Sequence, residues 1–253
     1  MAALTGGDRS CVRAYDLDMT TVDEIADGIY RISTPLAPEI LPGGFSFNQI
    51  LVVDDEPLLF HTGPRRMFPA VREAIDRVLP VSQLRYIAFS HFEADECGAL
   101  NDLLALAPNA VPVCGQVNAM VSVADVADRP PRALSDGELL SLGRHEVTWI
   151  DTPHLPHGWE TGYLFEKSTE TLFCGDLFTQ GGCDNPAITE SDLVGPSEAF
   201  RKRMDYYSHT KNARMLLTRL ASLRPQTLAC MHGSSFRGDG ALALMELADA
   251  LGA

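Results

Sequence analysis

Residues 84–98 read LRYIAFSHFEADECG, and this stretch carries most of the information about fold and site. The apolar segment over residues 84–90 predicts a buried strand. The polar run that follows it at once contains one histidine and three carboxylates: His91, Glu93, Asp95 and Glu96. Buried carboxylates are usually paired or bound to metal, because an unpaired buried charge is costly. The sequence therefore predicts a metal site at the end of this strand.

Residue types that bind metals also follow three later apolar strands. The segment HEVTWIDTP (145–153) is followed by His154 and, three residues further on, by His157. TLFCG (171–175) precedes Asp176, and TLACM (227–231) precedes His232. Functional side chains are commonly gathered on loops at the rim of a rigid scaffold. We therefore expect these four strand ends to meet at one rim.

The order of these segments resembles the metallo-β-lactamase fold, whose metal signature is HxHxDH, then a His, a bridging Asp and a final His. Here the signature begins His91-x-Glu93-x-Asp95, and HxExD is the form found in flavodiiron proteins. The segments FNQILVVDDEPLLFHTG, LAPNAVPVCG, CGDLFTQ and CMHGSSFR also resemble that group. The resemblance implies a four-layer αββα sandwich of the α/β (α+β) class. Residues 1–253 would form a single domain, with an N-terminal extension over residues 1–20.

The resemblance also implies a ligand set for two iron ions. One ion would bind His91, Glu93 and His154, the other Asp95 and His232, and Asp176 would bridge them. His154 is preferred to His157 because His154-Leu155-Pro156 fits the family pattern H-x-P. Glu96 stands where the pattern has a histidine and is left open between a ligand and a supporting residue. His157 and His61 are expected to support the ligands. So many carboxylates suit iron or manganese better than zinc, although Zn or Mn could substitute for iron.

The function implied is that of a non-haem di-iron protein that binds O2 or NO. It would reduce the gas with an external flavoprotein or rubredoxin-like electron donor, or sense O2. The chain ends at Ala253, so we expect no flavodoxin domain and no FMN. The main alternative is a hydrolase of the same fold that acts on an ester, thioester or lactone through a metal-bound hydroxide. A di-iron oxygenase is a further alternative, and a homodimer is expected.

Composition limits the partners of the chain. Its 253 residues carry a formal net charge of −14, which argues against a uniformly basic surface for nucleic acid or membrane. Hydrophobic residues make up 45% of the chain, an ordinary globular proportion. No apolar run approaches the roughly 20 residues of a membrane helix. The six cysteines are scattered without CxxC spacing, as in reduced proteins. We therefore expect a cytoplasmic protein that binds neither membrane nor nucleic acid.

Several local patterns complete the sequence-based description. Residues 34–44 and 181–196 are rich in turn-forming residues and predict irregular loops beside the site. Residues 196–223 predict one long helix, with Tyr206 and Tyr207 packed in the core. His145 and His209 are expected at the surface.

Overall fold

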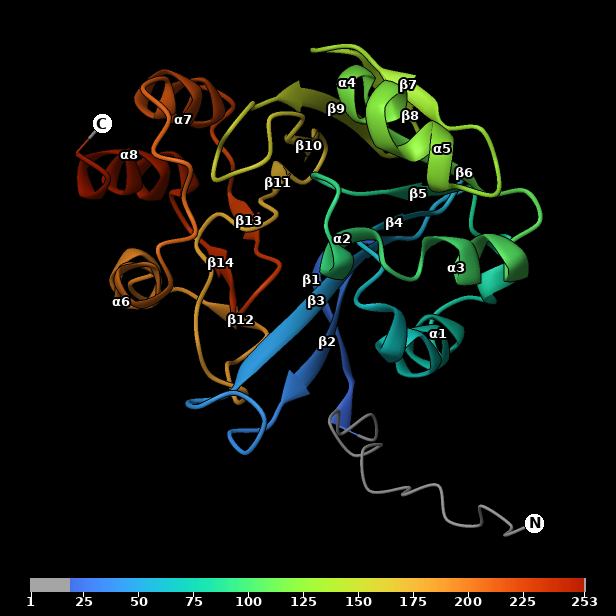
Figure 1. The fold of residues 1–253 in the computed structure, drawn as a ribbon, viewed down its shortest axis with the longest axis horizontal. Coiled ribbons are helices and arrows are strands. Elements are labelled where there is room, and N and C mark those ends of the chain that lie inside the picture. The colour runs from blue at the N-terminus through green and yellow to red at the C-terminus, as the bar shows by residue number, and fades with distance from the viewer. Residues whose placement is uncertain (1–18, 253) are drawn as a thin grey trace, which may run out of the picture.

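The computed structural model describes residues 19–252, and two sheets form its centre (Figure 1). The first sheet has the order β1-β2-β3-β4-β5-β6-β7. Neighbouring strands are antiparallel from β1 to β4 and parallel from β4 to β7. Its strands are β1 (Thr21–Ala26), β2 (Ile29–Leu36), β3 (Phe45–Val52), β4 (Leu58–Phe60), β5 (Tyr86–Ala88), β6 (Val111–Gly115) and β7 (Arg132–Leu134).

The second sheet is also mixed and has the order β12-β14-β13-β11-β10-β9-β8. The pairs β11·β13 and β12·β14 are parallel, and the other pairs are antiparallel. Its strands are β8 (Leu139–Ser141), β9 (Glu146–Asp151), β10 (Gly162–Glu166), β11 (Thr171–Phe173), β12 (Ile188–Thr189), β13 (Thr227–Ala229) and β14 (Ser235–Arg237).

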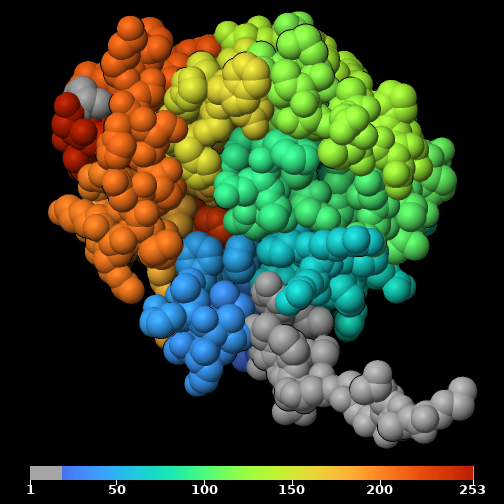
Figure 2. Space-filling model, viewed as in Figure 1, coloured from blue at the N-terminus to red at the C-terminus, as the bar shows by residue number. Residues whose placement is uncertain are grey.

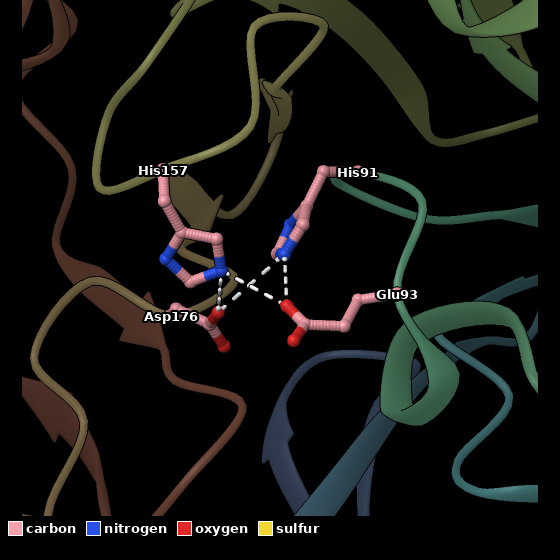
Figure 3. A group of neighbouring side chains, drawn as sticks. All are labelled: His91, Glu93, His157 and Asp176. Carbon is pink, nitrogen blue, oxygen red and sulfur yellow. Dashed lines mark hydrogen bonds and ion pairs between the residues drawn. The ribbon is translucent and has the colours of Figure 1, made fainter. Parts of the chain in front are cut away.

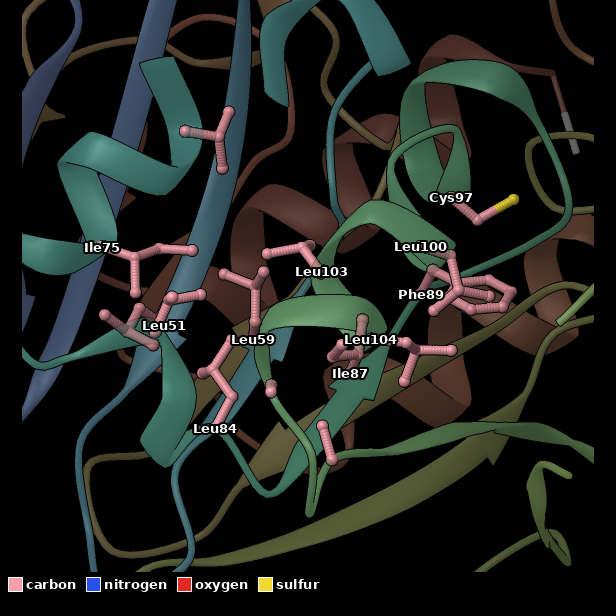
Figure 4. Close-up of a cluster of buried hydrophobic side chains, with 14 of the residues drawn as sticks. Leu51, Leu59, Ile75, Leu84, Ile87, Phe89, Cys97, Leu100, Leu103 and Leu104 are labelled. Carbon is pink, nitrogen blue, oxygen red and sulfur yellow. The ribbon is translucent and has the colours of Figure 1, made fainter. Parts of the chain in front are cut away.

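Helices cover the outer face of each sheet. On the first sheet lie α1 (Phe68–Asp76) and α3 (Leu100–Leu106), which share a buried apolar cluster with β3, β4 and β5 (Figure 4). On the second lie α7 (Ala213–Ala221) and α8 (Gly240–Ala250), packed against β10, β11 and β13. The remaining helical segments are α2 (Ala94–Cys97), α4 (Gln116–Asn118), α5 (Ala124–Val126), α6 (Val194–Met204), η3 (Arg65–Met67), η4 (Val81–Gln83) and η5 (Ala119–Val123). The predicted αββα sandwich is confirmed.

The two sheets face each other across a third apolar cluster. Phe60 and Ile50 contribute to it from the first sheet, and Trp149, Leu164 and Phe173 contribute from the second. The short β4, β5, β10 and β11 are buried along their whole length, since each is covered on both faces. The surface shows the N-terminal half, blue to green, beside the C-terminal half, yellow to red (Figure 2).

Two of the local predictions are wrong. The long helix over residues 196–223 is two helices, because α6 ends at Met204 and Asp205 adopts a left-handed conformation with φ of 47°. The chain then runs irregularly to α7, which begins at Ala213. His145 is buried rather than exposed and lies 3.2 Å from the buried Glu166 carboxylate. His209 is exposed, as expected.

Two further predictions concern domain limits and membranes. That residues 1–253 form one domain stays a prediction, and most of the extension over residues 1–20 lies outside the described residues. Within residues 19–252, no helix is long and apolar enough to cross a bilayer.

Candidate metal centre

The candidate ligands lie where strands of both sheets end. His91 follows β5, Glu93 directly precedes α2, and Asp95 and Glu96 belong to α2. Asp176 follows β11, and His232 follows β13. The expected meeting of strand ends is therefore present, with ligand-type side chains from the first sheet facing those from the second.

One group of ligand atoms surrounds a small central space (Figure 3). The Nε2 atoms of His91 and His157 each lie 3.0 Å from Glu93 Oε2. They lie 3.7 and 3.4 Å from Asp176 Oδ2, respectively. One ligand atom from each of these four residues lies within 4.8 Å of the others, a spacing that a single metal ion could bridge.

Asp176 turns its other oxygen toward a second group. Its Oδ1 lies 3.2 Å from His232 Nε2, which is itself 3.5 Å from Asp95 Oδ2. One carboxylate therefore faces histidines on both sides, one oxygen to each side. This is the geometry expected of a carboxylate that bridges two metal ions.

Supporting residues orient two of the histidines. His232 Nδ1 donates to the Ser46 carbonyl over 2.8 Å, which leaves the lone pair of Nε2 available to bind a metal ion. His91 Nδ1 lies 2.9 Å from Ser90 Oγ, which in turn is 3.1 Å from His61 Nε2. His61 is buried, and burial lowers its pKa to about 3. It lies behind His91 and outside the two groups of ligand atoms.

A set of hydrogen bonds from the first sheet holds the loop that carries His232. Asn48 Nδ2 donates to the carbonyls of Cys230 and Gly233, each over 2.9 Å. The buried Arg31 donates to the Gly233 carbonyl over 2.9 Å, and Ser46 Oγ accepts from Gly233 N–H. Gly233 has φ of 85°, and a Cβ there would come within 2.5 Å of the Gln180 side chain. We call Arg31, Ser46 and Asn48 the loop clamp.

Carboxylates outnumber imidazoles at the candidate metal centre, and their pKa values are shifted by one another and by the histidines. Hydrogen bonds from His157 and His91 lower the pKa of Glu93 to about 2. Burial alone would raise the pKa of Asp176, but the neighbouring histidines hold it below its usual value. Burial and then the Asp176 and Asp95 charges raise the pKa of Glu96 well above its ordinary value. Four carboxylates and three imidazoles at one point favour a bound cation.

The structure corrects the preferred histidine. The His154 side chain is exposed and lines a separate outer cavity of about 350 Å³ with Tyr207 and His209. His157 occupies the place in the ligand group that the H-x-P pattern assigned to His154. His154 has a φ of 64°, so the loop turns there and the side chain three residues later faces inward.

The sequence-based prediction missed or misplaced some of the residues that support the candidate metal centre. Tyr206, expected in the core, donates from its hydroxyl to the Asp176 carbonyl over 3.2 Å and meets the His157 ring edge-on at 6.2 Å. Tyr207 is buried in the core, as expected. Ser46 and Asn48 carried no signal in the sequence beyond their position at the start of an apolar strand.

The donor set fits two divalent ions of the iron or manganese type. Imidazole and carboxylate ligands suit these metals, whereas zinc sites more often use thiolates and few carboxylates. Both Glu96 oxygens and Asp176 Oδ1 are buried without a hydrogen-bond partner, as expected of atoms whose partner is a metal ion.

Comparison with known proteins identifies the family. The profile described as ODP family beta lactamase matches residues 45–233. The chain belongs to this family. Solved structures named as flavodiiron proteins share its fold. The predicted resemblance to the metallo-β-lactamase-like core of flavodiiron proteins is thereby confirmed.

Relatives and solved structures agree with this assignment. The chain is 30% identical to the rubredoxin-oxygen oxidoreductase of Megalodesulfovibrio gigas over 211 residues, which are 78% of this chain and 50% of the relative. It is 25% identical to the anaerobic nitric oxide reductase flavorubredoxin of Salmonella arizonae, over 81% of this chain and 44% of the relative. The Giardia intestinalis flavodiiron protein superposes with a TM-score of 0.79 at 19% identity, over 91% of this chain and 59% of that one. The ODP-family chain covers 26% to 50% of the curated relatives it matches.

Proposed function

We propose that this ODP-family chain binds two iron ions and uses them to bind and reduce O2 or NO. The observation that carries the proposal is the Asp176 carboxylate, which faces His91 and His157 through one oxygen and His232 through the other. Two irons, when bound, supply electrons and open coordination positions for the gas. The names of the relatives, an oxygen oxidoreductase and a nitric oxide reductase, point the same way.

The ligand assignment that we propose follows the two groups of atoms. One ion would be held by His91, Glu93 and His157, the other by Asp95 and His232, and Asp176 would be shared between the two positions. Ser90 and Ser46 contact the Nδ1 atoms of His91 and His232, so that each Nε2 would be directed toward a bound ion. The Tyr206 hydroxyl donates to the Asp176 carbonyl and so helps to hold this residue in place.

An external electron donor would approach from the side of Glu93. The side chain of Glu93 is 52% exposed, so the first metal position is close to the surface there. Beside it a cavity of about 630 Å³ is lined by Phe92, Glu93, Arg65 and Asp102, among others. A flavoprotein or a rubredoxin-like protein is the donor class we propose. The homodimer and the cytoplasmic location stay predictions.

Metal analysis paired with gas uptake tests the proposal. Protein produced with iron and reduced without oxygen should contain about two irons per chain and consume added O2 or NO when a donor is present. His157→Ala should lose metal and activity, whereas His154→Ala should keep both, because only His157 faces the cluster. Zinc in the purified protein without any reaction with O2 or NO would refute the proposal and favour the hydrolase.

A further inference from the structure

Glu96 is a polar side chain whose burial the fold alone does not explain. Its exposed fraction is 0%, and neither carboxylate oxygen has a hydrogen-bond partner. Placing an ionised carboxylate in such surroundings costs several kcal/mol unless a cation or a set of donors compensates. A function at this position would account for a residue that costs so much.

The helix that carries Glu96 does not provide the compensation. α2 spans only four residues, Ala94–Cys97, and no side-chain cap closes its N-terminus. The backbone N–H groups of this turn also make no bond to Glu96, since both its oxygens are unpartnered. A structural role as a helix cap is therefore not what holds the carboxylate in place.

The Glu96 carboxylate instead points at the metal centre. Its Oε1 lies 3.8 Å from His91 Nε2. One of its oxygens lies within 4.8 Å of carboxylate oxygens of Glu93 and Asp95. Three carboxylates thus crowd together on the α2 side, and their mutual repulsion is relieved either by a proton on one of them or by a cation between them. A cation would also provide a partner for both Glu96 oxygens, which a proton alone does not.

We propose that Glu96 binds the second metal ion together with Asp95, Asp176 and His232, and that this position prefers manganese. The inference rests on the two-metal site proposed above. The second position then has three carboxylates and one imidazole, whereas the first has two carboxylates and two imidazoles. Carboxylate oxygens suit Mn²⁺, and imidazole suits iron. The two positions are therefore inequivalent, and a mixed manganese–iron centre is the form expected when both metals are supplied, whereas iron alone fills both positions.

Competitive loading of the whole chain tests the inference. Metal-free protein is given equal Mn²⁺ and Fe²⁺ without oxygen, desalted, and analysed for metal content and for the Mn²⁺ paramagnetic resonance signal. Wild type should hold about one manganese and one iron. Glu96→Gln should bind manganese at least ten-fold more weakly and keep its iron. Glu96→His should shift the second position toward iron.

A matched control and a metal-free measurement separate a ligand from a structural residue. Glu160 is also a buried acid near the site, but it accepts a hydrogen bond from Phe92 N–H, so Glu160→Gln should leave both metals in place. Metal-free Glu96→Gln should unfold at the same or a higher urea concentration than metal-free wild type, because it removes an unpaired buried acid. A clearly lower midpoint would mean a structural role and would overturn the inference.

The possible failures are distinguishable. Two metals in both wild type and Glu96→Gln, in the same ratio, would overturn the role of Glu96 and leave the proposed function intact. Two irons in wild type from the equal mixture would overturn the manganese preference. A wild-type chain that binds no metal would overturn the proposed function, and the inference with it.

Discussion

Replacing Asn48 with alanine should destabilise the loop that carries His232. Asn48 Nδ2 is the only side-chain donor recorded for the Cys230 carbonyl within the described residues, while the Gly233 carbonyl keeps its bond from Arg31. An orphaned buried carbonyl costs about 1–3 kcal/mol, and the second lost bond adds about 1 kcal/mol. Asn48 Oδ1 has no partner, so its loss adds nothing. The expected cost is about 2–4 kcal/mol.

Urea unfolding in the presence of a chelator measures this cost without a contribution from metal binding. Asn185→Ala is the matched control, because Asn185 Nδ2 also donates to two carbonyls, those of Gly181 and Gly182. Asn185 is only half-buried, so water can replace its bonds and the cost should stay below about 1 kcal/mol. Equal costs for the two variants, or a cost under about 1 kcal/mol for Asn48→Ala, would refute the loop clamp.

Three further outcomes are expected. Burial by itself would raise the pKa of Glu166, but hydrogen bonds from the turn at residues 168–169 lower this pKa from 4.5 to about 2. Glu166 should therefore contribute about 3 kcal/mol above pH 4.5, lost as the pH falls toward 2. Glu166→Gln should flatten the unfolding free energy over that window, and an unchanged slope would disprove the assignment. Gly162→Ala should cost about 3 kcal/mol in urea unfolding, because the new Cβ overlaps the buried Trp149 ring; full stability would contradict this packing. Arg224 is exposed with φ of 54° after α7, so Arg224→Gly should raise thermal stability by about 0.5–1 kcal/mol, and a loss would count against backbone strain there.

The sequence, through its resemblance to a known family, predicted the architecture, and it predicted that most of the candidate ligands lie near one another. Apolar segments come directly before His91, Asp176 and His232. A buried strand followed at once by a ligand-type residue is a local pattern, so it can be recognised without knowledge of long-range contacts. The hydrophobic pattern likewise predicted the buried strands that precede the candidate ligands. It failed over residues 196–223, where no glycine or proline marks the break at Asp205 and tertiary contacts of Tyr206 and Tyr207 prevail over helix propensity.

The tertiary structure decided the features that depend on the direction in which a side chain points. Whether His154 or His157 reaches the cluster is set by the path of one turn, and three residues of sequence separation contain no information about it. The two-sided placement of Asp176 and the complete burial of Glu96 arise only when both sheets bring their strand ends together. The loop clamp joins Asn48 to a carbonyl 182 residues away. Residue types and their order thus determined which chemistry is available, and packing determined which side chains carry it.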